Sequence, residues 1–321
     1  MTSYTQWTNR CAVIDPSPRS DTGVPDSEHR GVLSLLPRSA RPYAVLARFD
    51  RPIGWWLLFW PCAWGVLLAG GERRWDLMLW LLLGAIAMRG AGCVYNDIVD
   101  ADLDRRVART ASRPVASGRV SRQAAAIWLG ALCLIGLVVL LQLGWQAQLV
   151  ALGSLALVAA YPFMKRITWW PQVWLGLVFT WGALVGWVEI RQDRLDVLAA
   201  LYAGSIAWCI GYDTIYALQD REDDLLVGIR SSALRLGKRV RLGVAGFYML
   251  ALACWGLAFW QLRPDWVTLV ALAPVALHLG FQVLMLDPED GSSALSQFRS
   301  NRDAGLIMAL SCWVVGNAGL I

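Results

Sequence analysis

Two acidic runs are the part of the sequence best suited to chemistry. Their oxygen-bearing side chains recur at every fourth position: Asn96, Asp100 and Asp104 in the first run, and Tyr216, Asp220 and Asp224 in the second. Residues four apart share one face of a helix, so each run stacks its polar groups in a row. Rows of carboxylate oxygens suit Mg²⁺, which keeps part of its water and shares phosphate oxygens with a substrate.

The two runs are related to each other. A shift of 120 residues places Asp100 on Asp220 and Asp104 on Asp224. One such run alone is better explained as a solvated acidic cap on a helix, but two at matching positions favour related halves that face one cavity. That cavity would fit a diphosphate bridged by several Mg²⁺ ions.

Basic residues near the acidic runs could hold the same phosphates. They are Arg109, Arg113, Lys165, Arg166 and Arg230. The alternative explanation, which suits most of them, is the excess of positive charge that membrane proteins carry on one side.

Arg89 is a different kind of candidate, because it lies inside an apolar block. An ionisable residue within a membrane segment is costly and is by default a functional candidate. It lies seven residues, or about two helical turns, before Asn96 and so shares its face. Its partner could be a protein carboxylate, Asp50 or Asp213, or an acidic substrate, and the residues alone favour neither.

The elements that must position these residues are membrane helices. The chain has 321 residues, of which 57% are hydrophobic and only 17% charged, against roughly 25% charged in soluble domains. About 20 apolar residues cross a bilayer as a helix, and open strands cannot do so. Nine apolar blocks fit this description: about 52–70, 76–95, 123–142, 146–163, 171–188, 197–216, 240–261, 266–286 and 304–321. We therefore predict an all-α integral membrane protein, a bundle of about nine transmembrane helices with two related halves around a central cavity.

Positive charge predicts the orientation and the domain limits. The N-terminal segment and alternate connections hold 23 of the 29 basic residues, and the remaining connections hold five. This split places the N-terminus and both acidic runs in the cytoplasm and the C-terminus outside. Residues 1–43 are polar, lack an apolar signal segment and contain acids that transit peptides avoid. We expect a loosely ordered cytoplasmic tail there and a transmembrane domain over 44–321.

The motifs together resemble the intramembrane aromatic prenyltransferases, and within them the 4-hydroxybenzoate polyprenyltransferases of ubiquinone biosynthesis. The paired acidic runs, with Asp97 in the first and Asp213 opening the second, carry the resemblance to the superfamily. Further matching stretches are Arg51–Trp56, Arg89–Asp97, Arg109–Pro114, Tyr161–Arg166, Pro171-Gln172 and Gly228–Ser232. Of these, Arg51–Trp56 and Tyr161–Arg166 point to the hydroxybenzoate branch. The resemblance covers about residues 44–321.

The resemblance implies an enzyme of a bacterial cell inner membrane. It would transfer a polyprenyl group from its diphosphate to the ring carbon ortho to the hydroxyl of 4-hydroxybenzoate or a similar aromatic acid. Mg²⁺ would be held with the diphosphate by Asn96, Asp100, Asp104, Asp220 and Asp224, which are the expected catalytic residues. Arg89, and more weakly Arg51, would bind the acceptor carboxylate. Tyr216, Asp213, Arg113, Lys165 and Arg230 complete the expected substrate-binding set. Membrane lipid is an expected partner and nucleic acid is not.

Two alternatives remain open at this level. A relative in the same superfamily could use another acceptor, such as homogentisate, dihydroxynaphthoate, haem or a phosphoribose. A transporter also uses repeats and membrane carboxylates, but it normally places them near the midplane. Here the carboxylates lie at helix ends beside basic loops. The sequence therefore favours a prenyltransferase well over a transporter.

Overall fold

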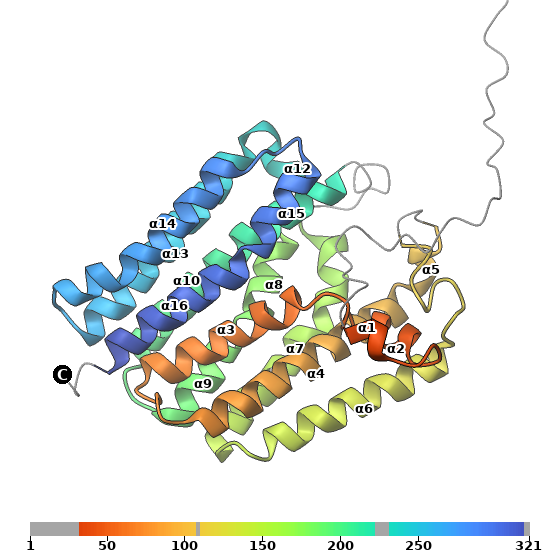
Figure 1. Ribbon diagram of the computed structural model, residues 1–321, viewed down its shortest axis with the longest axis horizontal. Helices are drawn as coiled ribbons and strands as arrows, with labels where there is room; N and C mark the ends of the chain where they lie inside the picture. Colours follow the sequence, from red (N-terminus) through yellow and green to blue (C-terminus); the bar gives the residue numbers. More distant parts are fainter. Residues whose placement is uncertain (1–31, 107–109, 222–230, 318–321) are drawn as a thin grey trace, which may run out of the picture.

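The computed structural model describes residues 32–106, 110–221 and 231–317. Every regular element in these ranges is a helix (Figure 1). The short helices α1, α2, α5, α12 and α15 gather at one end of the long ones (Figure 1). The α-helices of the first part are α1 (Val32–Leu35), α2 (Arg41–Leu46), α3 (Ile53–Leu68), α4 (Trp75–Val99), α5 (Ala101–Asp104), α6 (Arg122–Leu140), α7 (Trp145–Ile167), α8 (Pro171–Phe179) and α9 (Gly182–Ile190). The second part has α10 (Leu195–Tyr216), the 3₁₀ helices η1 (Ala217–Asp220) and η2 (Gly237–Arg239), α12 (Ser232–Leu236), α13 (Val240–Leu262), α14 (Trp266–Met285), α15 (Gly291–Arg299) and α16 (Asn301–Gly316).

The predicted apolar blocks correspond to helices. Seven helical stretches in the described ranges are long and apolar enough to cross a membrane. The first and last blocks form α3 and α16, which have 16 residues each and are shorter than those seven. An all-helical membrane bundle is confirmed, and nine crossings stay a prediction.

The fifth block contains a break that its composition does not reveal. The chain leaves the helix at Thr180, where the hydroxyl donates a hydrogen bond to the carbonyl of Gly176 at 2.8 Å. The block therefore divides into α8 and α9, and Phe179 at the end of α8 turns toward the cavity described below.

The two predicted halves are visible in the helix boundaries. Adding 120 to the first residues of α4, α6, α7, α8 and α9 reproduces those of α10, α13, α14, α15 and α16 to within two residues. The broken pair α8–α9 thus has a counterpart in the broken pair α15–α16. Corresponding neighbours also pack alike, since α6 lies along α4 as α13 lies along α10.

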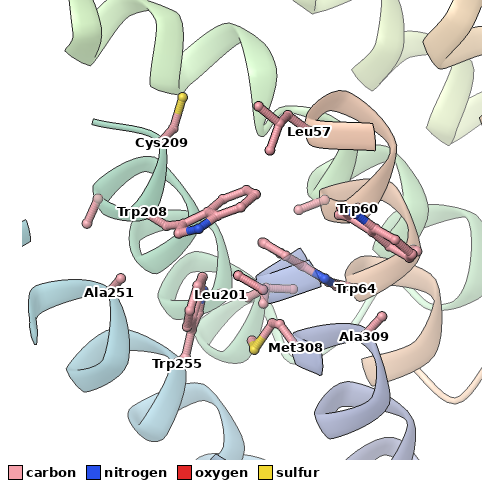
Figure 2. Close-up of a cluster of buried hydrophobic side chains, with 14 of the residues drawn as sticks. Leu57, Trp60, Trp64, Leu201, Trp208, Cys209, Ala251, Trp255, Met308 and Ala309 are labelled. Atoms are coloured by element: carbon pink, nitrogen blue, oxygen red, sulfur yellow. The ribbon is translucent and has the colours of Figure 1, made fainter. Parts of the chain in front are cut away.

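Close helix contacts hold the centre of the bundle. Helix α3 lies between α9 and α16, so segments from both ends of the chain are neighbours (Figure 1). Beside it, Trp64, Trp208 and Trp255 form a buried aromatic cluster (Figure 2). The indole of Trp64 donates to the carbonyl of Gly305 at 2.9 Å, and that of Trp208 donates to Asn301 Oδ1 at 2.8 Å. These bonds satisfy polar groups that would be costly to bury alone.

Gly65 allows α3 to approach α9, and this leads to a stability prediction. A Cβ at this position would collide with the backbone carbonyl of Ala183, which cannot move aside as a flexible side chain can. Overpacking of this kind costs about 1–3 kcal/mol, so Gly65→Val should lower the melting temperature of the detergent-purified protein. Gly246→Val on α13, where a Cβ meets nothing within 4 Å, is the matched control. Equal melting temperatures for the two variants would contradict this account.

Candidate active site

A large cavity of about 1810 Å³ opens among the N-terminal helices and α7–α10. One end of its wall is polar and contains Arg38, Arg41, Arg48, Asp50, Arg51, Asn96, Asp97, Arg113 and Arg119. The other end is apolar and is lined by Leu57, Leu81, Ala85, Val139, Leu140, Leu143 and Val185, among others. Along α4, the wall extends from Asp97 back to Leu81, a rise of about 24 Å at 1.5 Å per residue. The cavity can thus hold a molecule with a charged head and a long apolar tail.

The first acidic run begins at the polar end of this cavity, and of its three predicted residues only Asn96 lines the described wall. Asn96 lines the wall, while Asp100 and Asp104 are buried with exposures of 2% and 6%. Helix α4 ends next to Asp100, but the backbone bonds from Asp100 N to Asn96 O (2.9 Å) and from Asp104 N to Asp100 O (2.8 Å) continue across the break. The predicted four-residue register is therefore kept between α4 and α5.

Asp104 is held by a neighbouring cation. Its Oδ2 accepts a hydrogen bond from Arg113 Nη1 at 2.8 Å, and its backbone carbonyl accepts one from the Thr110 hydroxyl at 3.0 Å. Burial raises the pKa of the Asp104 carboxyl above its ordinary value, and the Arg113 guanidinium opposes that shift. Arg113 therefore lies beside the acidic row at the cavity wall, and its predicted contact with phosphate stays a prediction.

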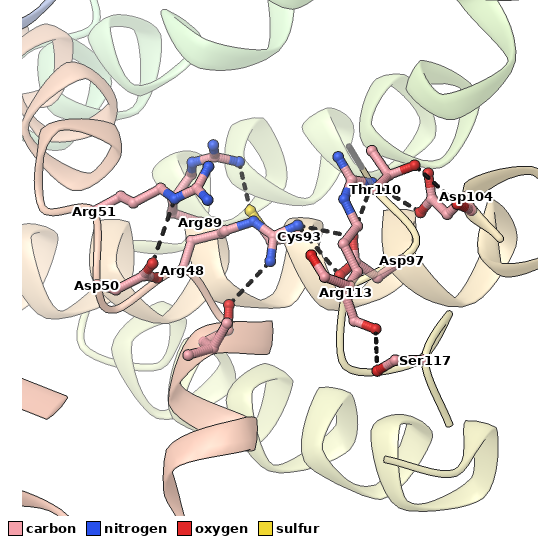
Figure 3. A network of polar contacts seen from close by, with 12 residues as sticks. Arg48, Asp50, Arg51, Arg89, Cys93, Asp97, Asp104, Thr110, Arg113 and Ser117 are labelled. Carbon is pink, nitrogen blue, oxygen red and sulfur yellow. Dashed lines mark hydrogen bonds and ion pairs between the residues drawn. The ribbon is translucent and has the colours of Figure 1, made fainter. Parts of the chain in front are cut away.

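Sequence reasoning did not single out the central ion pair of this site (Figure 3). Asp97 is only 2% exposed. Its carboxylate accepts hydrogen bonds from Arg48 Nη2 at 3.0 and 3.2 Å and from Arg113 Nη1 at 3.3 Å. Arg48 has a φ of 58°, a left-handed conformation that costs on the order of 1–3 kcal/mol unless its surroundings hold it. The two bonds to Asp97 and one from Nη1 to the carbonyl of Val45 at 3.0 Å hold it there. The group links the segment after α2 to the end of α4.

Arg89 lies deeper in the same cavity and does not pair with either protein carboxylate that the sequence offered. Its Nη1 donates to Cys93 Sγ at 2.7 Å, and its guanidinium lies over the Phe179 ring at 5.2 Å (Figure 3 shows the thiol contact). Asp50 instead contacts Arg51 Nε at 3.4 Å. Within the described ranges no ion pair of Arg89 is recorded, and its buried Nε has no hydrogen-bond partner. A cation so placed is suited to an anionic ligand.

The second acidic run is described in part. Asp213 and Tyr216 line the cavity, and the Tyr216 ring packs on Phe298 at 4.7 Å. η1 carries Asp220, whose side chain, like those of Lys165 and Arg166, lies outside the described residues, as do Arg109, Asp224 and Arg230. The predicted meeting of two carboxylate rows therefore stays a prediction.

A buried polar contact holds the start of α12 against α8 and α10. The hydroxyls of Thr214 and Ser232 are 2.7 Å apart, and the Ser232 amide donates to Gln172 Oε1 at 3.3 Å. This joins the end of α10, the start of α12 and the start of α8. Gln172 and Ser232 both lie in stretches that resemble the prenyltransferases. Their contact could not be predicted, because the two residues are 60 positions apart in the chain.

Donor chemistry decides whether this site fits a divalent cation. The amide and carboxylate oxygens of Asn96, Asp100 and Asp104 are ligands that Mg²⁺ accepts. No group of three His, Cys, Asp or Glu side chains within the described ranges is arranged to hold a metal by itself. In proteins, Mg²⁺ is usually held by one or two carboxylates together with substrate phosphates and water.

Comparison with known proteins agrees with this geometry. The model of the UbiA prenyltransferase family matches residues 58–311. A mitochondrial 4-hydroxybenzoate polyprenyltransferase of Drosophila pseudoobscura pseudoobscura is 42% identical over 297 residues, which are 91% of this chain and 75% of the relative. The apo structure of a UbiA homolog from Aeropyrum pernix K1 is similar, with a TM-score of 0.62 and 25% identity over 80% of this chain and 96% of that one. A UbiA homolog from Archaeoglobus fulgidus bound to GPP and Mg²⁺ shares the fold, with a TM-score of 0.66 at 16% identity over 86% of this chain and 100% of the other. The family match spans most of the chain, and the chain belongs to the UbiA prenyltransferase family.

Proposed function

We propose that this protein transfers a polyprenyl group from polyprenyl diphosphate to the ring carbon ortho to the hydroxyl of 4-hydroxybenzoate, in ubiquinone biosynthesis. The observation that carries the proposal is the cavity, which joins a polar end with Arg48, Asn96 and Arg113 to a long apolar arm. The relative from Drosophila pseudoobscura pseudoobscura is named as a 4-hydroxybenzoate polyprenyltransferase. Arg89, a half-buried cation without a described carboxylate partner, supports an acidic acceptor.

At the polar end, the residues are suited to hold the diphosphate. We assign Asn96, Asp100 and Asp104, with Asp220 and Asp224 of the second run, to Mg²⁺, which supplies neutralisation of the diphosphate charge when it is bound. Arg113, Lys165 and Arg230 are assigned to phosphate oxygens, which the two guanidinium groups bind in a planar fork and the Lys165 ammonium binds as a point charge. As the bond between the prenyl carbon and the diphosphate oxygen breaks, its electron pair leaves with the diphosphate.

Deeper in the cavity, the residues are suited to hold the acceptor. We assign Arg89 to the acceptor carboxylate, with Arg51 as the weaker candidate. Tyr161, Phe179 and Tyr216 line the space beside it, and aromatic faces stabilise a cation such as the allylic carbon. The ring carbon ortho to the phenol forms the new carbon–carbon bond, and its proton passes to a base, for which Asp220 is our candidate.

An assay on membranes that contain the protein tests the proposal. Labelled 4-hydroxybenzoate and a polyprenyl diphosphate are supplied with Mg²⁺ or with EDTA. We expect lipid-soluble label that requires the metal. Inserted protein without such transfer contradicts the proposed acceptor, and release of diphosphate with homogentisate or dihydroxynaphthoate instead would assign the chain to another acceptor.

The protein is a multi-pass membrane protein, and we propose a bacterial cell inner membrane with the N-terminus and the polar end of the cavity in the cytoplasm. The split of 23 against five basic residues between alternate connections supports this orientation. An alkaline phosphatase fused after residue 321 should then be active in a bacterial host, since it would lie in the periplasm. A fusion inserted between Gly118 and Arg119 should be inactive, and the opposite pattern would reverse the proposed orientation.

The N-terminal segment leads to a truncation prediction. Leu33, Ser34 and Arg38 line the cavity, and Leu33 is only 6% exposed. Deletion of residues 1–31 should leave transfer near the wild-type rate, whereas deletion of residues 1–40 should lower it several-fold because part of the wall is removed. Initial rates on membranes with matched protein content compare the two. An inactive but inserted 32–321 protein would contradict the proposal that the first residues are a dispensable tail.

A further inference from the structure

One glycine on the cavity wall is not explained by helix packing. Five glycines line the cavity, and at four of them a Cβ would come closer to a neighbour than an ordinary van der Waals contact: Gly54, Gly84, Gly136 and Gly182. At Gly92, in the interior of α4, a Cβ would meet nothing within 4 Å. Glycine inside a helix costs about 1 kcal/mol relative to alanine. The packing and the helix would therefore both accept a larger residue here.

The position of Gly92 relates it to the two ends of the acceptor. It follows Arg89 by three residues and precedes Asn96 by four, so the three residues share one face of α4. At 1.5 Å per residue, Arg89 and Asn96 are separated by about 10 Å along the axis, with Gly92 between them. Phe179 covers the Arg89 guanidinium at 5.2 Å. The open space over Gly92 thus lies between a cation for a carboxylate and the polar end where the diphosphate is proposed to bind.

The corresponding position in the second half of the molecule carries a large side chain, which lines the same cavity from α10. The 120-residue shift that relates the helices places Gly92 on Tyr212 and Arg89 on Cys209. Tyr212 is 1% exposed, packs its ring against Trp208 at 4.8 Å and accepts the Cys209 thiol proton at a heavy-atom distance of 2.9 Å. A side chain as large as tyrosine can therefore be accommodated at this position of the repeat. Its absence at position 92 leaves room on the cavity side.

We propose that Gly92 is the specificity-determining residue for the acceptor. The aromatic ring lies across the bare backbone at Gly92, with its carboxylate toward Arg89 and its reacting carbon toward Asn96. This inference rests on the proposed transfer to 4-hydroxybenzoate and adds to it the place of the ring. Any side chain at position 92 narrows the space for the ring and does not touch the polar end.

Kinetics of Gly92→Ala and Gly92→Leu test the inference. Gly130→Leu is the matched control, because Gly130 is an exposed glycine of the membrane helix α6, a Cβ there meets nothing within 4 Å, and it does not line the cavity. The acceptors are 4-hydroxybenzoate and the bulkier 4-hydroxy-3-methoxybenzoate, each with a polyprenyl diphosphate and Mg²⁺.

A misfit of one methyl or methylene group typically changes discrimination between substrates by about 10–200-fold. We expect Gly92→Ala to raise the KM for 4-hydroxybenzoate about tenfold and to affect the methoxy compound more. Gly92→Leu should lower kcat/KM for both acceptors by about 100-fold, with the KM for the prenyl diphosphate unchanged and Gly130→Leu like wild type.

The outcomes separate this inference from the proposed function. Wild-type protein that prenylates 4-hydroxybenzoate, together with unchanged acceptor kinetics in Gly92→Leu, overturns the role of Gly92 and leaves the function standing. An equal rise in the KM for the prenyl diphosphate also overturns it, since the ring would not be the group that is displaced. If Gly92→Leu fails to insert, Gly92→Ala decides, because alanine favours the helix. Wild-type protein that prenylates neither benzoate overturns the function and the inference together.

Discussion

Asp100→Ala and Asp104→Ala should each reduce prenyl transfer by about 10²–10³-fold, the range found when one group that stabilises developing charge is removed. The two residues are buried one helical turn apart, in register with Asn96, which lines the polar end of the cavity. Without either, the leaving diphosphate loses part of its neutralisation. Rates at increasing Mg²⁺ concentration measure the effect, and we expect the loss to be partly recovered at high Mg²⁺.

Asp102 is the matched control for this experiment. It lies between the two carboxylates in the chain, but its side chain is 69% exposed and pairs with Arg122 at 2.6 Å. Exposed pairs contribute little to stability, so Asp102→Ala should transfer at close to the wild-type rate. Asp220→Ala and Asp224→Ala extend the test to the second run. If Asp100→Ala and Asp104→Ala both retain activity, the proposed pair of carboxylate rows is wrong.

Arg89→Gln should raise the KM for 4-hydroxybenzoate by about 30-fold or more, because losing one partner of a buried charge pair costs about 2–5 kcal/mol. The KM for the prenyl diphosphate should change little. 4-Hydroxybenzamide, which lacks the carboxylate, is the control acceptor. The wild-type protein should prefer the acid strongly, and Arg89→Gln should lose most of that preference.

The Arg89→Gln variant also shows whether Arg89 binds the acceptor carboxylate or the diphosphate. If Arg89→Gln instead raises the KM for the prenyl diphosphate and leaves that of the acceptor unchanged, Arg89 binds the diphosphate and the acceptor assignment is contradicted. A structural role alone would lower the melting temperature without altering the choice between acid and amide. Measuring both substrates and the melting temperature therefore separates the three roles.

Much of the fold could be predicted from sequence because lipid leaves the backbone few choices. Long apolar blocks must be helices, and the spacing of the acidic runs already contained the 120-residue repeat that the helix boundaries follow. The break at Thr180 could not be predicted, since apolar residues continue on both sides and a single hydroxyl bond marks it. Arg89 was found because charge inside an apolar block is visible in the sequence, but its contacts with Cys93 and Phe179 depend on packing.

The Arg48–Asp97 pair shows a different limit. Asp97 is one residue away from the face that holds Asn96 and Asp100, and its partner lies 49 positions away in the chain. A periodicity argument selects residues that share a face and passes over a neighbour that turns toward another element. A left-handed backbone is signalled in a sequence by glycine or asparagine, and the arginine at position 48 gives no such signal.

The two copies of the 120-residue repeat contribute unequally to the cavity wall. Helices of the first copy form most of the cavity wall, while α13, α14 and α16 contribute none of its described lining residues. Helices α13 and α14 instead turn large apolar side chains such as Leu242, Met249, Trp266 and Leu277 outward. The second copy reaches the cavity only through α10 and α15 among its described helices, while its α13 and α14 face the surrounding lipid. The outer surface of α13 and α14 could be redesigned, for a thinner membrane or for an immobilising support, without altering a residue that the reactants touch.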